Sequence, residues 1–178
     1  MRKFRLIIIT GLPGTGKTTL ALELARRHGL ALISKDTIKE PLMDVVGLPT
    51  HLATSLGPDA PSRALSNISF GVMFSMAQEL LALGDSLILE GNFRSREHEA
   101  PLLAVLPPNG PTIVQVLCSA NEEERRSRLL QRADDPARHA GHRDARQLEP
   151  VAACDSFLDL PGERLTYRVG SESCETLF

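Results

Sequence analysis

The feature that most constrains the fold of this chain is a glycine-rich turn close to the start of the sequence. Residues 11–18 read GLPGTGKT and fit the pattern GxxxxGK[ST]. The apolar run Leu6–Thr10 precedes the turn, and Lys17–His28, which has helical periodicity, follows it. In such an arrangement glycines let backbone N–H groups point inward, and the N-terminus of the helix adds partial positive charge. The turn is therefore predicted to wrap a polyphosphate.

The side chains of this turn have separate expected roles. Lys17 is expected to contact the β and γ phosphates of a nucleoside triphosphate, and the Thr18 hydroxyl is expected to bind Mg²⁺. The predicted nucleotide-binding residues of the turn are Gly11, Pro13, Gly14, Thr15, Gly16, Lys17, Thr18 and Thr19. ATP and Mg²⁺ are the groups that this set would hold.

Short β-branched runs alternate along the chain with longer stretches of helical period. This alternation is typical of a parallel sheet covered by helices on both faces. The expected strands are Leu6–Thr10, Leu30–Ser34, Ser86–Glu90, Thr112–Cys118 and Leu165–Val169. At 178 residues the chain is predicted to form one domain, residues 1–178, with a single core.

A long helix is predicted from Ser62 to Leu83, capped by Ser62 at its start and Gly84 at its end. Apolar residues spaced by three and four predict its buried stripe, which is Leu65, Ile68, Val72, Met76, Leu80 and Leu83. The stretch before this helix contains Pro41, Pro49, Pro58 and Pro61 and is expected to be irregular. Two interpretations of that stretch stay open: the wall of a substrate pocket, or a loop without function.

Composition excludes several classes of protein. A net charge of -2 and seven aromatic residues argue against an extended nucleic-acid surface. Cys118, Cys154 and Cys174 have no metal-ligand spacing, and an odd number of cysteines suits a reducing compartment, so a cytoplasmic location is expected. No apolar run approaches the length of a membrane span.

Asp36 follows the second expected strand, where ligands of open parallel sheets bind. An aspartate at this position can accept the proton of a hydroxyl group that attacks the γ-phosphate. The alternative is a helix N-cap. A helix that began at Thr37 would contain Pro41, which favours the catalytic interpretation.

Glu90 ends the third expected strand. Its carboxylate can hold the water shell of Mg²⁺, or it can bind the hydroxyl of the acceptor. Asn92 and Arg94 follow on a loop that is expected to border the same crevice and bind substrate. For Arg94 the alternative to a phosphate or substrate contact is a surface ion pair.

Arginines are concentrated between Arg125 and Arg146. A helix is expected over Asn121–Arg132, with Asn121 and Glu124 at capping-box spacing, and Arg128 and Arg132 share a face with Arg125. These arginines are expected to meet an anionic ligand. The alternative is a solvated helix in which Glu122 and Glu124 form ion pairs with Arg126 and Arg128. The polar loop at residues 138–144 is predicted to fold over the nucleotide as part of a lid region of about residues 125–146, which brings Arg138 and Arg143 to the substrates. No further His or Cys lies at metal-ligand spacing from His139 and His142, which argues against a zinc site there.

Five segments together resemble the P-loop kinase group of small phosphotransferases. They are residues 11–18 (GLPGTGKT), 34–36 (SKD), 87–93 (LILEGNF), 128–132 (RLLQR) and 138–142 (RHAGH). The resemblance is greatest to the branch with chloramphenicol phosphotransferase, the polynucleotide 5'-hydroxyl kinase domain and zeta-toxin-like kinases.

This resemblance implies a three-layer α/β/α P-loop NTPase fold with a five-stranded parallel sheet in the order 2-3-1-4-5. It also implies that Asp36 is the general base, that Arg128 lies near the adenine or the phosphates, and that Arg132 and the lid arginines contact the phosphoryl group. Lys39 stands where relatives commonly have an arginine that reaches toward the transferred phosphate, so it is expected to contact substrate.

The function expected from these residues is an ATP- and Mg²⁺-dependent kinase with Lys17, Asp36, Arg128 and Arg132 as catalytic residues. Its acceptor would be a hydroxyl of a small molecule or of a nucleic-acid 5' end. The alternative is a nucleotide-binding switch or scaffold with slow hydrolysis and no acceptor. Residues 44–47 do match the DxxG pattern of a switch, but they follow no expected strand, and the NKxD motif of GTPases is missing.

Overall fold

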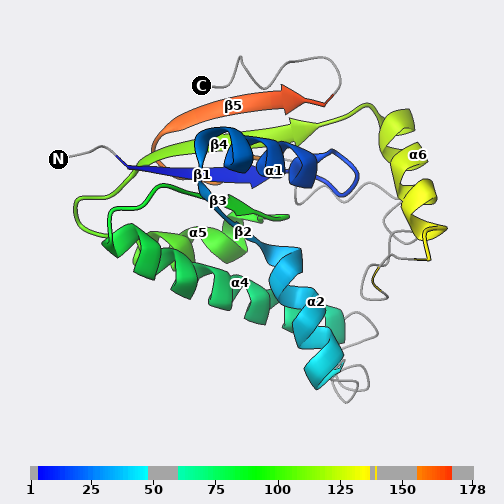
Figure 1. Cartoon of the computed structure of the whole chain (residues 1–178), viewed down its shortest axis with the longest axis horizontal. Coiled ribbons are helices and arrows are strands. Elements are labelled where there is room, and N and C mark those ends of the chain that lie inside the picture. Colours follow the sequence, from blue (N-terminus) through cyan, green and yellow to red (C-terminus); the bar gives the residue numbers. More distant parts are fainter. Residues whose placement is uncertain (1–3, 48–59, 137–138, 140–155, 170–178) are drawn as a thin grey trace.

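The computed structural model describes residues 4–47, 60–136, 139 and 156–169, and these form a single parallel sheet with flanking helices (Figure 1). The strands are β1 (Arg5–Thr10), β2 (Ala31–Ser34), β3 (Leu87–Glu90), β4 (Thr112–Ser119) and β5 (Glu163–Arg168). The described helices are α1 (Lys17–His28), α2 (Lys35–Val46), α4 (Ala60–Ala82), α5 (Ser95–Ala104) and α6 (Glu122–Ala133). Each strand lies within two residues of the range expected for it.

The strand order is β2-β3-β1-β4-β5, and every neighbouring pair is parallel. The predicted fold class and strand order are therefore confirmed. Because all strands point the same way, their carboxyl ends lie at one edge of the sheet. The turn after β1 and helix α6 lie beyond that edge (Figure 1).

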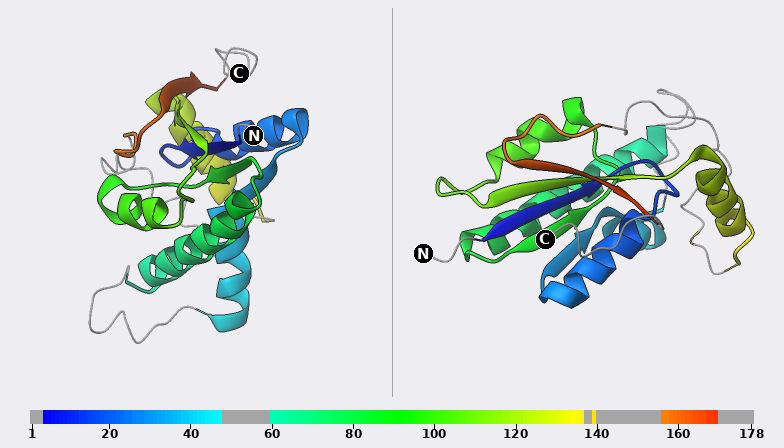
Figure 2. Two further views of the ribbon diagram at one scale, coloured as in Figure 1. Left: turned by 90° about the vertical axis from the view of Figure 1, so that its left-hand side faces the viewer. Right: turned by 90° about the horizontal axis from the view of Figure 1, so that it is seen from above.

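The two faces of the sheet bury separate clusters of side chains. Ile7 and Ile9 of β1 pack with Leu20 and Leu24 of α1 on one face. Leu6 and Ile8 pack with α4 and α5 on the other. The two layers of helices are seen on opposite sides of the sheet in Figure 2. Burial on both faces explains why β1 and β3 read as continuous apolar runs, whereas the edge strand β5 alternates and is mostly exposed.

The expectation of an irregular chain after β2 was wrong for its first half. Residues 35–46 form helix α2, which contains Pro41 in its interior. Pro41 is exposed, while Ile38 packs against the core and the Lys39 ammonium donates to Ser62 Oγ of α4 at 3.1 Å. Contacts with α4 thus outweigh the backbone hydrogen bond that proline removes. Pro49 and Pro58 lie outside the described residues, and Pro61 falls in the first turn of α4, where proline is tolerated.

Helix α4 buries a different face from the predicted one. Of the expected stripe, Leu65 is buried and Leu80 is half-buried, but Ile68, Val72, Met76 and Leu83 are exposed. The buried face consists of Phe70, Met73, Phe74, Ala77 and Leu81. Ser62 is not the cap, because the helix begins two residues earlier, at Ala60. The α4 sequence is apolar on nearly all sides, so spacing alone does not select a face.

Helix α5 was not expected from the sequence, since it is short and contains Pro101. It begins directly after the loop that carries Asn92 and Arg94, and it buries His98 and Leu102. Among the residues described here, no helix is both long enough and apolar enough to cross a membrane.

Candidate active site

The turn after β1 has the backbone of a phosphate-binding loop. Gly14 and Gly16 have φ angles of 85° and 86°, in the left-handed region that favours glycine. Gly16 is the N-cap of α1, and a Cβ atom built on it would lie 2.5 Å from Cγ2 of Val169, which follows β5. Backbone conformation and packing therefore both require glycine at position 16. Thr15 stabilises the turn by donating its hydroxyl to the Leu12 carbonyl at 2.8 Å.

Lys17 points back over this turn. Its side chain is buried, and its ammonium donates to the Leu12 carbonyl oxygen at 2.9 Å. Burial lowers the pKa of Lys17, while the Glu90 carboxylate opposes this by favouring the charged form. The Asp36 carboxylate also raises the pKa of Lys17, whereas the Lys35 ammonium lowers it. Both residues therefore lie within electrostatic range of the Lys17 ammonium. Thr18 and Thr19 are exposed at the start of α1.

Glu90 brings together hydroxyl groups from two other elements. Parallel pairing sets Ser34 of β2 and Ile9 of β1 in register with Glu90 at the end of β3. Ser34 Oγ donates to Glu90 Oε2 at 2.5 Å, and Thr18 Oγ1 donates to Glu90 Oε1 at 3.4 Å. One carboxylate oxygen and the exposed Thr18 hydroxyl therefore face each other. These are the hard oxygen ligands that Mg²⁺ prefers, and Mg²⁺ needs few ligands from the protein.

Asp36 lies in the first turn of α2, next to the end of β2. It is not the N-cap of this helix, since Ser34 occupies that position. Lys35 Nζ is 2.6 Å from Asp36 Oδ1, and the same ammonium donates to Asn92 Oδ1 at 3.4 Å. Asn92 belongs to the loop after β3. The Lys35 ammonium thus connects the start of α2 with this loop.

The other two expected substrate residues have protein partners. Lys39 lies one helical turn beyond Lys35 and donates to Ser62, as described above. Arg94 Nη1 is 3.2 Å from Glu97 Oε1, and the Arg94 backbone N–H donates to His98 Nδ1 at 2.8 Å. For Arg94 the structure shows the ion pair that was the alternative interpretation. Contact of Arg94 with substrate remains a prediction.

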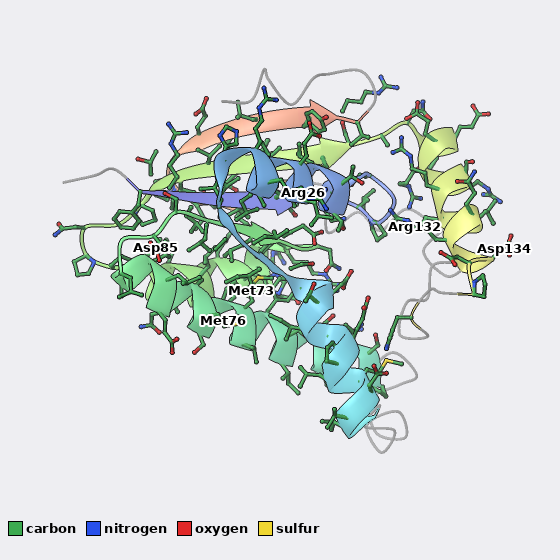
Figure 3. The ribbon with its side chains drawn as sticks, viewed as in Figure 1. Arg26, Met73, Met76, Asp85, Arg132 and Asp134 are labelled. Carbon is green, nitrogen blue, oxygen red and sulfur yellow. The ribbon has the colours of Figure 1, made fainter. Side chains whose placement is uncertain are left out.

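Helix α6 places one arginine on the phosphate-binding turn. The expected cap is present, because the Glu124 backbone N–H donates to Asn121 Oδ1 at 2.7 Å. Arg128 Nη1 donates to the Gly14 carbonyl at 3.3 Å, and Arg128 Nη2 is 3.8 Å from Glu124. Arg125 is buried and bonded to Glu122, which raises the pKa of Arg125. Arg132 is half-buried in the last turn of α6 (Figure 3).

Part of the predicted lid lies outside the described residues, including Arg138, His142 and Arg143. His139 is described, and its Nε2 is 2.9 Å from Asp44 Oδ1 of α2. Residues 44–47, which match DxxG, lie at the C-terminal end of α2 rather than in a loop after a strand. In the described part of the chain, no three His, Cys, Asp or Glu residues cluster as in metal sites built mainly from these side chains.

Two site residues were missed by the sequence reasoning. Ser34 and Lys35 directly precede Asp36, yet only Asp36 was given a role. The signal for Ser34 was available, because parallel strands of similar length place their last residues side by side. Lys35 gave no such signal, since its burial depends on how α2 packs after the strand.

Comparison with known proteins gives consistent relatives. The profile of a protein family described as "AAA domain" matches residues 6–153. Uncharacterized proteins of Mycobacterium tuberculosis and Mycobacterium bovis are 32% identical over 132 residues, which is 72% of this chain and 26% of each relative. The chain therefore spans about a quarter of the length of these curated relatives.

Solved structures of similar fold include kinases. A "putative kinase" from Chloroflexus aurantiacus has a TM-score of 0.83 and 30% identity, covering 98% of this chain and 95% of its own. The APS kinase of Mycobacterium tuberculosis, crystallised with AMPPNP and APS, has a TM-score of 0.53 and 22% identity, covering 99% and 94%. A sugar kinase from Janibacter has a TM-score of 0.58 and 18% identity, covering 99% and 90%. The last two establish likeness of fold alone.

Proposed function

The chain belongs to the family described as "AAA domain" and to the P-loop kinase group, and from this membership we propose that it transfers the γ-phosphate of ATP to a hydroxyl group in a Mg²⁺-dependent reaction. The acceptor is a small molecule or a nucleic-acid 5' end. The observation that carries this proposal is the convergence of Lys17, Glu90 and Asp36 at one edge of the sheet.

The chain's own groups are arranged to hold a triphosphate. The N-terminus of α1 and the inward amides of the turn bind phosphate oxygens, and Lys17 contacts the β and γ phosphates. Arg128, already bonded to the Gly14 carbonyl, is placed to contact the nucleotide. AMPPNP in the M. tuberculosis APS kinase supports an adenine nucleotide. When bound, Mg²⁺ would be held by Thr18 and Glu90 and would neutralise phosphate charge.

Asp36 is the proposed general base. Its carboxylate accepts the proton of the acceptor hydroxyl as that oxygen attacks the γ-phosphorus. A bond forms between the acceptor oxygen and phosphorus, and the bond from phosphorus to the β,γ-bridging oxygen breaks, so that ADP leaves. Arg132, Arg138 and Arg143 neutralise the charge on the phosphoryl group. Lys39, Asn92 and Arg94 orient the acceptor.

Nothing in the described structure favours the switch or scaffold alternative. The DxxG residues are helical and end α2 at Gly47. Asp36, by contrast, follows the end of β2 and lies within electrostatic range of the Lys17 ammonium, which supports the kinase interpretation.

Transfer from γ-labelled ATP tests this proposal. The acceptor panel is nucleosides, 5'-hydroxyl oligonucleotides, aminoglycosides, chloramphenicol and sugars. We expect labelled product with the wild type and its loss in Asp36→Asn, because the amide cannot take up the proton. Asp85→Asn, an exposed aspartate before β3 (Figure 3), is the matched control and should transfer at the wild-type rate. Transfer that survives Asp36→Asn removes the general-base assignment.

Nucleotide binding is tested separately by thermal unfolding. Mg-ATP at one hundred times its Kd should stabilise the wild type by about 2.7 kcal/mol. Lys17→Ala should abolish this gain, whereas Arg26→Ala at the opposite end of α1 should keep it. A Lys17→Ala variant that is still stabilised by Mg-ATP would place the nucleotide elsewhere.

A further inference from the structure

Lys35 is a buried cation next to Asp36, the proposed general base, and the reaction described above gives it no role. It is 8% exposed. The Lys35 ammonium connects two elements, since it is 2.6 Å from Asp36 Oδ1 of α2 and 3.4 Å from Asn92 Oδ1 of the loop after β3. Its Cβ packs close to Gly91, because a Cβ atom on that glycine would lie 3.2 Å from it.

Lys17 of the phosphate-binding turn is a second buried cation, and it lies within electrostatic range of Lys35. Burying an ammonium group costs free energy unless a counter-ion accompanies it. Asp36 is the counter-ion of Lys35 in this structure.

The proposed transfer changes that pairing, and the following inference rests on the proposed function. We propose that Lys35 is a further catalytic residue, whose ammonium bonds to Asp36 before the reaction and to an oxygen of the transferred phosphoryl group during it.

Charge balance during the transfer supports this exchange of partners. As Asp36 takes up the acceptor proton its carboxylate becomes neutral, and Lys35 loses its counter-ion. At the same moment the acceptor oxygen becomes part of a phosphate ester whose oxygens carry negative charge. The ammonium therefore gains a new partner when the old one is neutralised. An interaction that is made in the transition state and not in the ground state accelerates the chemical step.

Two other cations were proposed to orient the acceptor, Lys39 and Arg94, and both are placed less favourably for contact with the transferred phosphoryl group. Lys39 lies one turn further along α2, where its ammonium donates to Ser62. Arg94 pairs with Glu97 on the surface of α5. Lys35, by contrast, bridges Asp36 and Asn92.

The test compares ground-state and transition-state ligands in Lys35→Met, Lys35→Arg and Arg26→Met. The probes are Mg-ADP alone, Mg-ADP with aluminium fluoride as a mimic of the transferred phosphoryl group, and Mg-ATP with water as the acceptor. Lys35→Met should bind Mg-ADP within about twofold of the wild type but bind the fluoride complex at least about tenfold more weakly, and release phosphate about 10²-fold more slowly. Lys35→Arg should recover part of both losses, and Arg26→Met should match the wild type.

An Asp36→Asn variant sharpens the test. Asp36→Asn removes the anionic partner of Lys35 and leaves the neutral Asn92 amide, so affinity for the fluoride complex should be kept or increased although transfer is lost. Adding Lys35→Met to this variant should remove that affinity. The two substitutions are therefore expected to be non-additive, as coupled groups are.

The outcomes separate this inference from the proposed function. If the wild type transfers phosphate and Lys35→Met binds the fluoride complex as tightly as Arg26→Met does, Lys35 has no catalytic role. Equal loss of Mg-ADP and fluoride-complex affinity in Lys35→Met also overturns the inference, because it indicates a structural role. A wild type that fails to bind Mg-ADP overturns the proposed function and the inference together.

Discussion

At the scale of single residues, His98 holds the loop that carries Asn92 and Arg94. Its Nδ1 accepts the Arg94 backbone N–H at 2.8 Å, and its ring lies against Phe70 with centroids 3.8 Å apart. Burial lowers the pKa of His98 to about 4, so the ring is neutral at pH 7. A neutral imidazole is required here, because protonated Nδ1 could not accept this hydrogen bond.

This gives a prediction for stability against pH. The pKa of His98 is about 4 in the folded chain and near 6.5 in the unfolded chain, so protons bind the unfolded chain more strongly between these values. The contribution of His98 is complete above pH 6.5 and is lost as the pH falls toward 4. Between pH 7.5 and pH 5 it should remove about 2 kcal/mol from the free energy of unfolding, measured by urea denaturation.

His98→Gln isolates the effect, because an amide oxygen can accept the same hydrogen bond without titrating. Between pH 7.5 and pH 5, His98→Gln should therefore lose about 2 kcal/mol less of its free energy of unfolding than the wild type loses. His28→Gln, an exposed histidine in the last turn of α1, should follow the wild-type curve. A His98→Gln curve parallel to the wild type contradicts the burial argument.

At the scale of elements, α4 shows why a spacing pattern can select the wrong face. Both stripes of this helix are apolar, but the aromatic rings of Phe70 and Phe74 pack with Phe93, with centroids 5.1 and 6.5 Å apart. Those contacts with the loop after β3 orient the helix. Met73 is fully buried between α4 and the sheet, while Met76 is 45% exposed on the outer side (Figure 3).

The two methionines provide a matched pair of variants on one helix. Met73→Ala should lower the free energy of unfolding by about 2 to 5 kcal/mol, because it leaves a cavity in the core. Met76→Ala should change it by less than about 0.5 kcal/mol, as surface substitutions do. Chemical denaturation of both variants measures the difference. Equal effects would mean that the face predicted from spacing is partly buried after all.

Helix α2 shows a second limit of local sequence signals. Proline inside a helix removes a hydrogen bond, so Pro41 indicated an irregular chain. Helix α2 forms because it packs along α4, a separate helix that begins at Ala60. By contrast, α1 spans Lys17–His28 as expected, and the glycines Gly16 and Gly29 that cap its two ends are local signals.

At the scale of the whole molecule, Gln115 ties the centre of the sheet to the segment before β5. It is fully buried in β4. Its Oε1 accepts from the Leu158 backbone N–H at 2.9 Å, and its Nε2 donates to the Leu160 carbonyl at 3.4 Å. This segment leads into the edge strand β5, after which Val169 packs on Gly16. The side chain therefore links the last strand to the site at the start of the chain.

Replacing Gln115 by leucine should destabilise the whole fold. The change leaves the buried Leu158 N–H without its acceptor and removes one of two donors to the Leu160 carbonyl, which Arg164 Nη2 also contacts at 3.5 Å. The expected cost is about 1 to 3 kcal/mol in the free energy of unfolding. Urea denaturation measures this loss, and Gln131→Leu on the exposed side of α6 is the control, with little expected change. If Gln115→Leu has the same free energy of unfolding as the wild type, other groups must form hydrogen bonds with the Leu158 N–H and the Leu160 carbonyl.

The sequence by itself determined the parts that depend on local chemistry: the phosphate-binding turn, the strand ranges, and Asp36 and Glu90 at the ends of strands. Its resemblance to a known group supplied the strand order. Contacts within the folded chain determine which face of α4 is buried, that α2 is a helix despite Pro41, and that Lys35 joins the site. These depend on contacts between segments far apart in the chain, and free energy from such packing can exceed the local preference of any one segment.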